Sequence, residues 1–207
     1  MVDLATLTAA VEAGDRKTAV AITQSAIDEG MAPQLILDAM TKAMDTVGGK
    51  FARNELYVPE MLISARAMKE STALLEPLLV KAGIRPEHTA VVGTIKGDLH
   101  DIGKNLVAMM WKGAGIAIVD LGTNVSAEQF VAAAREHNAS LVGVSALLTT
   151  TMVGMKDVVA AVKGSGLRTK VLVGGAPLTS EFAASIGADG YAPDAASAVE
   201  VARGILG

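Results

Sequence analysis

Apolar residues in the first 82 positions recur every three or four residues, which is the spacing of a helix face that packs against other helices. The clearest series are Leu37–Val47 and Met61–Leu75. Turn-forming residues divide this stretch at three points, namely Gly14–Asp15, Gly30–Pro33 and Gly48–Gly49. The pattern therefore predicts four helices, and we expect Pro77 to break the last of them.

The pattern changes after residues 81–88, KAGIRPEH, which combine glycine, proline and charge as linkers do. Beyond them, short β-branched runs alternate with helical segments. The runs lie at 89–95, 116–121, 140–146, 170–175 and 188–192, and helical segments are expected near 103–113, 126–137, 151–164, 178–186 and 194–206. The change of pattern predicts two domains, residues 1–84 and 85–207.

Five β/α units with almost wholly apolar strands predict a parallel sheet that is covered by helices on both faces. We therefore expect an α/β fold, with an N-terminal four-helix bundle followed by a flavodoxin-like or Rossmann-like five-stranded parallel sheet of order 2-1-3-4-5. That order places a ligand crevice at the carboxyl ends of strands 1 and 3. In this chain those ends carry the polar segments KGDLHDIGKN and SALLTTT.

Composition narrows the class of protein. Hydrophobic residues make up 51% of the 207 residues, so the chain can bury proper cores, and the absence of cysteine excludes disulfides and thiolate metal sites. The net charge of −4 and the lack of a basic tract argue against a nucleic-acid partner. No apolar run approaches the ~18–20 residues that span a bilayer, and the N-terminus lacks the order of a signal peptide. We expect a soluble, cytoplasmic protein with no membrane partner.

The segment GDLHDIGKN, residues 97–105, is the strongest candidate for chemistry. Its spacing fails the P-loop pattern, the dinucleotide-binding glycine pattern and the HExxH zinc pattern. Asp98, His100 and Asp101 could in principle hold a metal ion, but three ligands from one tight loop rarely converge. An ordinary loop histidine that caps a helix start remains an alternative for this segment alone.

Another interpretation fits the chemistry better. His100 is suited to be a single axial ligand, and Asp98 can hold its other ring nitrogen, which fixes the tautomer and raises the basicity. Gly97 and Gly103 let the backbone approach a large flat ligand. Ser145, at the end of the third strand, is placed to complete a hydrogen-bond relay to Asp98. Asp120 and Asn124 lie at the same edge, where contact with a ligand or a partner and a loop-capping role are equal alternatives.

Three short segments resemble, in order and spacing, the D-x-H-x-x-G … S-x-L … G-G signature of vitamin B12-binding domains. They are DLHDIG at 98–103, SAL at 145–147 and GG at 174–175. GDLHDIGKNLV, VDLGTNV, GADGYAPDAASAV and, in the helical half, YVPEMLISARAMK further resemble the corrinoid proteins of methylamine, methanol and O-demethylase methyltransferase systems. The resemblance covers essentially the whole chain.

The resemblance implies that cobalamin, or a related corrinoid, binds with its own base displaced, and that His100 is the cobalt ligand. Asp98 and Ser145 would form the relay behind His100, and the helical half would cap the upper face of the corrin. The remaining cofactor-binding residues implied by position are Asp101, Ile102 and Gly103 in the histidine segment, Leu147 and Thr149 after strand 3, Gly174 and Gly175 ending strand 4, and Tyr191, Ala192 and Asp194 at the end of strand 5.

The resemblance also implies a function, that of a methyl shuttle. The chain would accept a methyl group on Co(I) cobalamin from a donor-specific methyltransferase and pass it to a second methyltransferase acting on tetrahydrofolate or coenzyme M. A reductive activator of the corrinoid would be a further partner, and the chain would be a carrier subunit rather than a catalyst alone.

Three other functions stay open. The chain could be the cobalamin-binding subunit of a B12-dependent isomerase, although such chains usually lack the helical half. It could be a B12 sensor, although no DNA-binding domain is found in it. A flavodoxin-like module that binds FMN is the third. No residue decides which methyl donor the shuttle would serve.

Overall fold

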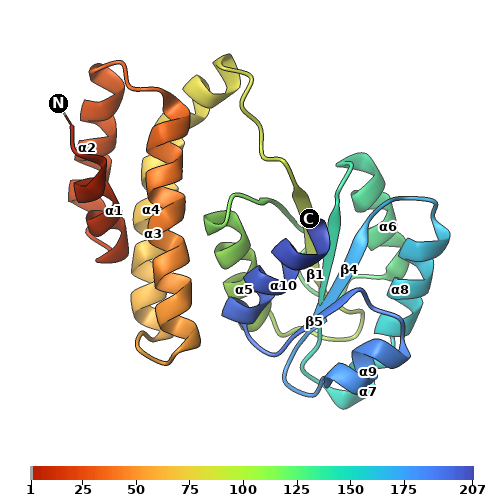
Figure 1. Cartoon of the computed structure of the whole chain (residues 1–207). Coiled ribbons are helices and arrows are strands. Elements are labelled where there is room, and N and C mark those ends of the chain that lie inside the picture. The colour runs from red at the N-terminus through yellow and green to blue at the C-terminus, as the bar shows by residue number, and fades with distance from the viewer. Residues whose placement is uncertain (1) are drawn as a thin grey trace. The chain divides into compact units, whose positions relative to one another are not determined.

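Two structural units follow one another in the computed structural model, which describes residues 2–207 (Figure 1). Contacts between backbone segments group the chain into one unit that ends at Pro86 and a second unit, Glu87–Gly207. The first unit is helical and the second holds a sheet. Each is described by itself.

The helical unit contains four helices, as the apolar spacing predicts. They are α1 (Leu4–Glu12), α2 (Arg16–Asp28), α3 (Pro33–Ala52) and α4 (Val58–Lys81). Helix α1 packs against α2 and α3, and α4 packs against α2 and α3, which closes a bundle. Asp3 and Asp15 cap the first two helices by accepting hydrogen bonds from the backbone N–H groups of Ala5 and Thr18.

Two expectations for the helical unit were wrong. Gly48 and Gly49 do not separate helices but lie within α3, where Gly48 is buried; the helix ends later, before Asn54, which has a φ of 58°. Pro77 does not end α4, which runs unbroken to Lys81. In Figure 1 the last turns of α4, in yellow, bend away from the preceding turns, which is how a helix accommodates an internal proline.

The second unit is built on five strands, all paired in parallel. They are β1 (Thr89–Thr94), β2 (Ala117–Asp120), β3 (Leu141–Ser145), β4 (Lys170–Gly174) and β5 (Gly190–Ala192). Their order in the sheet is β2-β1-β3-β4-β5, which confirms the predicted order. Buried residues dominate β1, β3 and β4, because helices cover the sheet on both faces.

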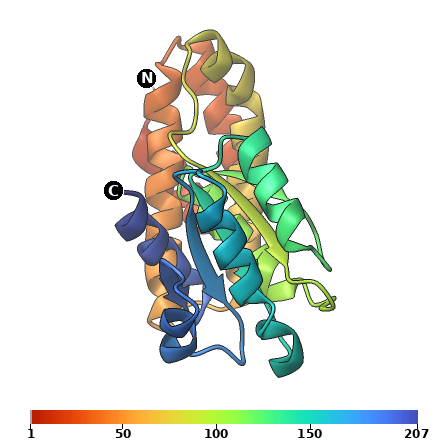
Figure 2. The same ribbon diagram turned by 90° about the vertical axis from the view of Figure 1, so that its right-hand side faces the viewer.

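Helices α5 (Ile102–Gly113) and α10 (Ala195–Leu206) contact each other and cover one face of the sheet. Helices α6 (Ala127–Glu136) and α8 (Met155–Gly164) cover the other face, which is turned toward the viewer in Figure 2. The helix expected near 151–164 is divided into the short α7 (Thr149–Met152) and α8. Helix α9 (Ser180–Ser185) follows β4.

Trp111 ties α5 to the sheet and to α10. Its side chain is fully buried, and the indole N–H donates a hydrogen bond of 2.9 Å to the carbonyl oxygen of Ala198. A Cβ atom at Gly143 would lie 2.8 Å from the indole ring, so the glycine in the central strand makes room for the tryptophan.

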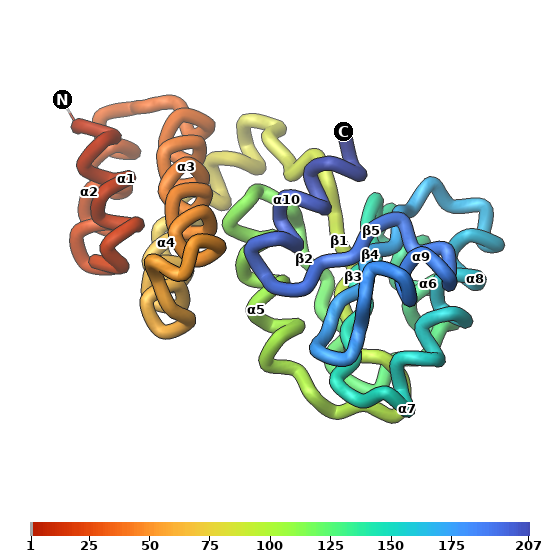
Figure 3. The backbone as a smooth tube through the Cα atoms, turned by 60° about the horizontal axis from the view of Figure 1, so that its bottom comes forward, coloured from red at the N-terminus to blue at the C-terminus, as the bar shows by residue number. Residues whose placement is uncertain are grey.

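The carboxyl ends of the four neighbouring strands β1, β3, β4 and β5 form a continuous row. Thr94 pairs with Ser145, Ser145 with Gly174, and Gly174 with Ala192. We call this row and the loops that follow it the carboxyl edge; Figure 3 brings that end of the sheet forward. None of the helices in residues 2–207 combines the length and the apolar character that a bilayer crossing requires.

Candidate functional site

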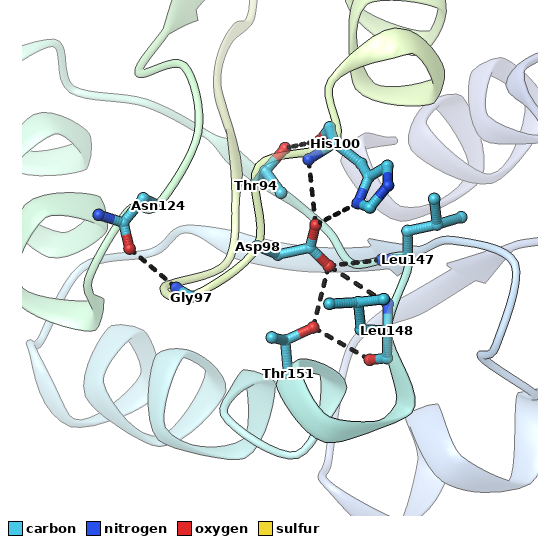
Figure 4. Close-up of polar contacts among 8 residues, drawn as sticks. All are labelled: Thr94, Gly97, Asp98, His100, Asn124, Leu147, Leu148 and Thr151. Atoms are coloured by element: carbon cyan, nitrogen blue, oxygen red, sulfur yellow. Dashed lines mark hydrogen bonds and ion pairs between the residues drawn. The ribbon is translucent and has the colours of Figure 1, made fainter.

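A buried carboxylate organises the carboxyl edge. Asp98 follows β1, and its side chain has no exposed surface. One carboxylate oxygen, Oδ1, accepts hydrogen bonds from the backbone N–H and the ring nitrogen Nδ1 of His100, at 3.1 and 2.9 Å. The other, Oδ2, accepts from the loop after β3: from the N–H groups of Leu147 and Leu148, at 2.8 and 3.3 Å, and from Thr151 Oγ1, at 2.9 Å (Figure 4).

These contacts hold Asp98 in its charged form. Burial by itself would raise the pKa of the carboxyl group, because it disfavours the anion. The hydrogen bonds from Leu147, His100 and Thr151 act in the opposite direction and outweigh it, so the pKa of Asp98 lies well below its usual range. Asp98 is therefore an anion throughout the physiological pH range.

The arrangement leaves one nitrogen of His100 available. A charged carboxylate can only accept, so Nδ1 of the neutral ring carries the hydrogen that Asp98 receives. In that tautomer Nε2 has a free lone pair, and Nε2 makes no hydrogen bond within residues 2–207. The His100 side chain is 55% exposed. An oriented, exposed imidazole of this kind can bind a metal ion through Nε2.

Further hydrogen bonds fix the backbone of the histidine loop, residues 95–101. Thr94 donates its hydroxyl hydrogen to the carbonyl oxygen of His100 at 2.8 Å. Asn124 accepts from the N–H of Gly97 through its side chain, at 2.8 Å, and donates its own N–H to the carbonyl oxygen of Asp98, at 3.1 Å. Of the two roles left open for Asn124, the structure supports that of a loop anchor.

The surroundings of His100 are apolar and open. Leu99 and Ile102, on either side of it in the chain, are 74% and 82% exposed. Gly103 has no heavy atom within 4 Å of the position where a Cβ would stand, and its φ is not positive. In the part of the chain that the structure describes, no steric contact or backbone conformation requires a glycine there. Gly97 differs, because its φ of 85° favours glycine by conformation alone.

The expected link between Ser145 and Asp98 was wrong. Ser145 ends β3, and its carbonyl oxygen accepts a hydrogen bond from the N–H of Ile95. The hydroxyl that donates to Asp98 belongs to Thr151, six residues later in α7. The turn after β3 brings Thr151 back over the carboxylate, whereas Ser145 remains in the row of paired strand ends. The sequence did not predict the contact of Thr151 with Asp98, because the two residues are 53 positions apart and only the fold brings them together.

The other residues predicted after β3 and β4 lie at the same edge. Leu147 is 42% exposed and reaches Asp98 through its backbone, and Thr149 is exposed at the start of α7. Gly174 pairs with Ser145 in the sheet. Gly175 has a φ of 135°, and a Cβ there would stand 1.8 Å from the carbonyl oxygen of Ala146. The close packing of two backbones thus explains the second glycine.

The residues predicted after β5 already have partners in the chain. The Tyr191 hydroxyl donates to the carbonyl oxygen of Leu178 at 2.9 Å, and Ala192 is buried. Asp194 caps α10 by accepting hydrogen bonds from the N–H and the hydroxyl of Ser197, at 2.8 and 2.9 Å.

Asp101 belongs to the opposite end of the row, beside the histidine. It precedes α5 but does not cap it through its side chain; its carboxylate instead accepts from the Asn105 amide at 3.0 Å. Within residues 2–207, no group of three or more His, Asp or Glu side chains is arranged to hold a metal ion, so Asp98, His100 and Asp101 do not form a protein-only metal site.

Comparison with known proteins places this geometry in a family. Residues 88–200 match the family described as "B12 binding domain", and residues 4–76 match a second family with the same description. The chain is 42% identical over 200 residues to a corrinoid protein of Desulfitobacterium hafniense, an alignment that covers 94% of this chain and 93% of that protein. The chain belongs to the corrinoid proteins with B12-binding domains.

Other relatives of this corrinoid protein carry more specific descriptions. The dimethylamine corrinoid protein of Methanosarcina barkeri is 38% identical over 92% of this chain and 91% of its own length. Among solved structures, the methanol:cobalamin methyltransferase complex of M. barkeri superposes with a TM-score of 0.86 and 29% identity, covering 98% of this chain and 79% of that one. A cobalamin-binding protein of D. hafniense superposes with a TM-score of 0.81 and 27% identity, over 100% of both chains.

The carboxyl edge fits the cofactor that the family implies. A corrinoid is a large, flat and mostly apolar ring around a cobalt ion, and it needs one axial ligand and a surface on which to lie. His100 offers a single oriented nitrogen, Leu99 and Ile102 offer exposed apolar surface beside it, and Gly103 leaves free the space that a side chain would fill.

Proposed function

We propose that this corrinoid protein is a methyl carrier that uses a corrinoid with its own base displaced and His100 as the axial ligand. The observation that carries the proposal is the pairing of His100 Nδ1 with the buried, charged Asp98, which orients the exposed ring so that its other nitrogen, Nε2, is available as a ligand. Held there by His100, a corrinoid would supply the nucleophilic cobalt chemistry that methyl uptake and release require. The protein supplies position, ligation and shielding from water.

The chain's own residues divide these tasks. His100 would donate its Nε2 lone pair, while Asp98 keeps the hydrogen on Nδ1 and fixes the plane of the ring. Thr151 and the N–H groups of Leu147 and Leu148 keep Asp98 charged. A proton taken up during the cycle would therefore reside on the imidazole, and ring protonation would release the ligand.

The nucleotide tail of the corrinoid would lie along the row of strand ends. We assign to it residues at this edge that either end β3, β4 and β5 or follow these strands, namely Ser145, Leu147, Thr149, Gly174, Gly175, Tyr191, Ala192 and Asp194. Asp101, Ile102 and Gly103 would lie under the corrin ring beside His100. The hydrogen bonds that Tyr191 and Asp194 make within the chain leave them a supporting role at the far end of the tail.

The helical unit, for which we keep the expected domain range 1–84, would cover the upper face of the corrin. Its support is a group of exposed apolar side chains at the start of α4, where soluble helices usually carry polar residues: Tyr57, just before the helix, is 67% exposed, and Leu62 and Ile63 in its first turns are 41% and 50% exposed. Such a cover must open when a partner enzyme acts, so we place a hinge in the linker from Gly83 to Pro86.

We infer three kinds of partner: a donor-specific methyltransferase, a second methyltransferase that acts on tetrahydrofolate or coenzyme M, and a reductive activator. Support comes from the relatives, since one is described as a dimethylamine corrinoid protein and another belongs to a methanol:cobalamin methyltransferase complex. Methylamines and methanol are therefore the donors to test first. In this role the chain is a carrier subunit and not a catalyst by itself.

The test of ligation uses protein labelled with ¹⁵N-histidine and loaded with hydroxocobalamin, from which unbound cofactor is removed. After reduction to Co(II), the electron paramagnetic resonance spectrum should show the doublet splitting of a ¹⁵N axial ligand, whereas a ¹⁴N triplet would indicate the cofactor's own base. His100→Ala should abolish the doublet, and His137→Ala, an exposed histidine after α6, should leave it unchanged. A triplet in the wild-type protein would refute His100 as the ligand.

The test of the carrier function adds purified methanol- or dimethylamine-specific methyltransferases to the reduced, loaded protein. Methylation of the cobalt, followed by absorbance, should require the donor, its methyltransferase and the loaded carrier together. Failure to retain any corrinoid would reopen the FMN interpretation, and methylation by none of these enzymes would direct attention to the isomerase or sensor alternatives.

A further inference from the structure

A buried lysine lies one turn beyond the histidine loop. The side chain of Lys104, in the first turn of α5, is only 3% exposed. Its ammonium nitrogen lies 2.7 Å from both carboxylate oxygens of Asp120 and 2.6 Å from Oδ1 of Asn105. An ammonium group has three hydrogens, so these contacts satisfy all of them.

Local helix preferences do not explain this lysine. The N-terminal end of a helix carries partial positive charge, so a cation in the first turn is unfavourable. Burying a cation adds a desolvation cost that a paired carboxylate offsets only in good geometry, and an apolar residue of the same size would avoid both costs. We therefore explain the presence of a lysine at position 104 by the two segments that its ion pair with Asp120 joins.

The ion pair connects the start of α5 to the end of β2. Asp120 is the last residue of β2, and its Oδ1 also accepts a hydrogen bond of 2.9 Å from the N–H of Gly122. The carbonyl oxygen of Gly122 in turn accepts from the N–H of Thr94, at 2.9 Å, and the Thr94 hydroxyl holds the carbonyl oxygen of His100. The chain of contacts thus leads from Lys104 back to His100.

His100 consequently lies between two anchors. On one side, Asp98 binds the loop after β3 through Leu147, Leu148 and Thr151. On the other side, Lys104 and Asp120 hold α5 against the loop after β2. Asp98 orients the imidazole ring, but its contacts do not fix where α5 begins, and the position of the His100 backbone depends on both.

We propose that Lys104 and Asp120 are positioning residues for the cobalt ligand: the ion pair of the buried Lys104 with the partly exposed Asp120 fixes the start of α5 and thereby the reach of His100 Nε2 above the carboxyl edge. This inference rests on the proposed function, in which His100 binds cobalt. Neither residue touches the metal. Loss of the pair should leave corrinoid retention intact, since the tail is held at the other strand ends, but should weaken histidine ligation.

The experiment compares Lys104→Met, Asp120→Asn and the double variant in ¹⁵N-histidine-labelled, corrinoid-loaded protein. The ratio of histidine-bound to histidine-free Co(II) should fall about 10-fold in each, the effect typical of removing the support behind a metal ligand. Lys112→Met, which removes an exposed lysine from the last turn of the same helix, is the matched control and should not change the ratio. Ratios within twofold of wild type in all three variants would overturn the proposal.

A second readout needs no cofactor. In the cofactor-free protein, amide hydrogen exchange at His100 and in the first turn of α5 should be about 10-fold faster in the double variant, whereas exchange in β3 and β4 should not change. The double variant leaves no buried charge without a partner, so it is expected to fold even if Asp120→Asn does not. Unchanged exchange around His100 would also overturn the proposal.

If Lys104 and Asp120 only stabilised the fold, any variant of similar stability loss would weaken histidine ligation equally. Val162→Ala creates a cavity under α8, far along the chain from the histidine loop, and should lower stability without changing the ¹⁵N doublet. If Val162→Ala reduces ligation as much as Lys104→Met does, general destabilisation explains the effect and the proposal fails. If the wild-type protein shows no ¹⁵N doublet at all, the assignment of His100 fails instead, so the two failures are distinguishable.

Discussion

Thr151 Oγ1 lies 2.9 Å from Asp98 Oδ2 and 3.0 Å from the carbonyl oxygen of Leu148. A hydroxyl group has only one hydrogen, so Thr151 can donate to one of these acceptors at a time. The charged carboxylate is the stronger acceptor. Through this bond and the two N–H groups before it, one buried anion joins the histidine loop to the loop after β3.

Removing that hydroxyl should destabilise the second unit. Thr151→Val keeps the shape of the side chain but deletes a hydrogen bond to a charged, buried group, so the free energy of unfolding should fall by about 1.5–3 kcal/mol. Ser145→Ala is the control, since Ser145 does not bind Asp98, and it should change stability by less than about 0.5 kcal/mol. Urea unfolding of the cofactor-free proteins measures both, and equal effects would contradict the assignment of Thr151.

Gly175 should tolerate no side chain. In Gly175→Ala the added carbon would overlap the carbonyl oxygen of Ala146, and the φ of 135° is itself unfavourable for alanine. The backbones of the loops after β3 and β4 would have to separate, and we expect a loss of more than about 2 kcal/mol in the free energy of unfolding. Thermal unfolding monitored by circular dichroism is sufficient to detect it. A variant as stable as wild type would show that this backbone contact is dispensable.

Gly103→Ala should behave in the opposite way. The residue lies in the first turn of α5 with open space around it, so alanine should leave the cofactor-free protein unchanged or stabilise it by about 0.5–1 kcal/mol. The new methyl group would, however, stand where the corrin ring is proposed to lie, and hydroxocobalamin should bind more weakly. Equilibrium dialysis and urea unfolding together test both halves, and unimpaired binding would remove Gly103 from the site.

Acid should remove the contribution of Asp98 to stability. Its pKa is lower in the folded protein than the value of about 3.9 expected in the unfolded chain, so the stabilisation is fully present at neutral pH and is lost as the pH falls below about 4 toward the folded-state pKa. The difference in free energy of unfolding between wild type and Asp98→Asn should therefore be larger at pH 7 than at pH 3. A difference that does not depend on pH would show that Asp98 contributes by shape and not by charge.

Most of the fold was predictable because β1, β3 and β4 are almost wholly apolar and most turns are marked by local residues. The two errors in the helical unit have a common cause. Gly48, Gly49 and Pro77 disfavour helix locally, but α3 and α4 bury their faces in the bundle, and that packing outweighs the local preference.

The sequence predicted only those contacts of the site that join residues close together in the chain. The contact between Asp98 and His100 spans two residues, and their spacing indicated it. Thr151 and Asp98 are 53 residues apart, and Lys104 and Asp120 are 16 apart. Serine and threonine after β3 offer the same hydroxyl chemistry, so the sequence could not decide which of them reaches Asp98. From the sequence alone, a lysine in a helix is expected at the surface, and only the fold shows that Lys104 is buried.

The tryptophan of α5 that packs on the central strand provides an intrinsic fluorescence signal for the unfolding of the second unit. Trp111 is the only tryptophan in the chain and is fully buried in the second unit, whereas the four helices before it contain none. Its fluorescence therefore follows the opening of residues 87–207 alone, while the circular dichroism of helices reports on both units. Coincident transitions would mean that the two units unfold as one cooperative block, and separated transitions would give each its own free energy from a single titration.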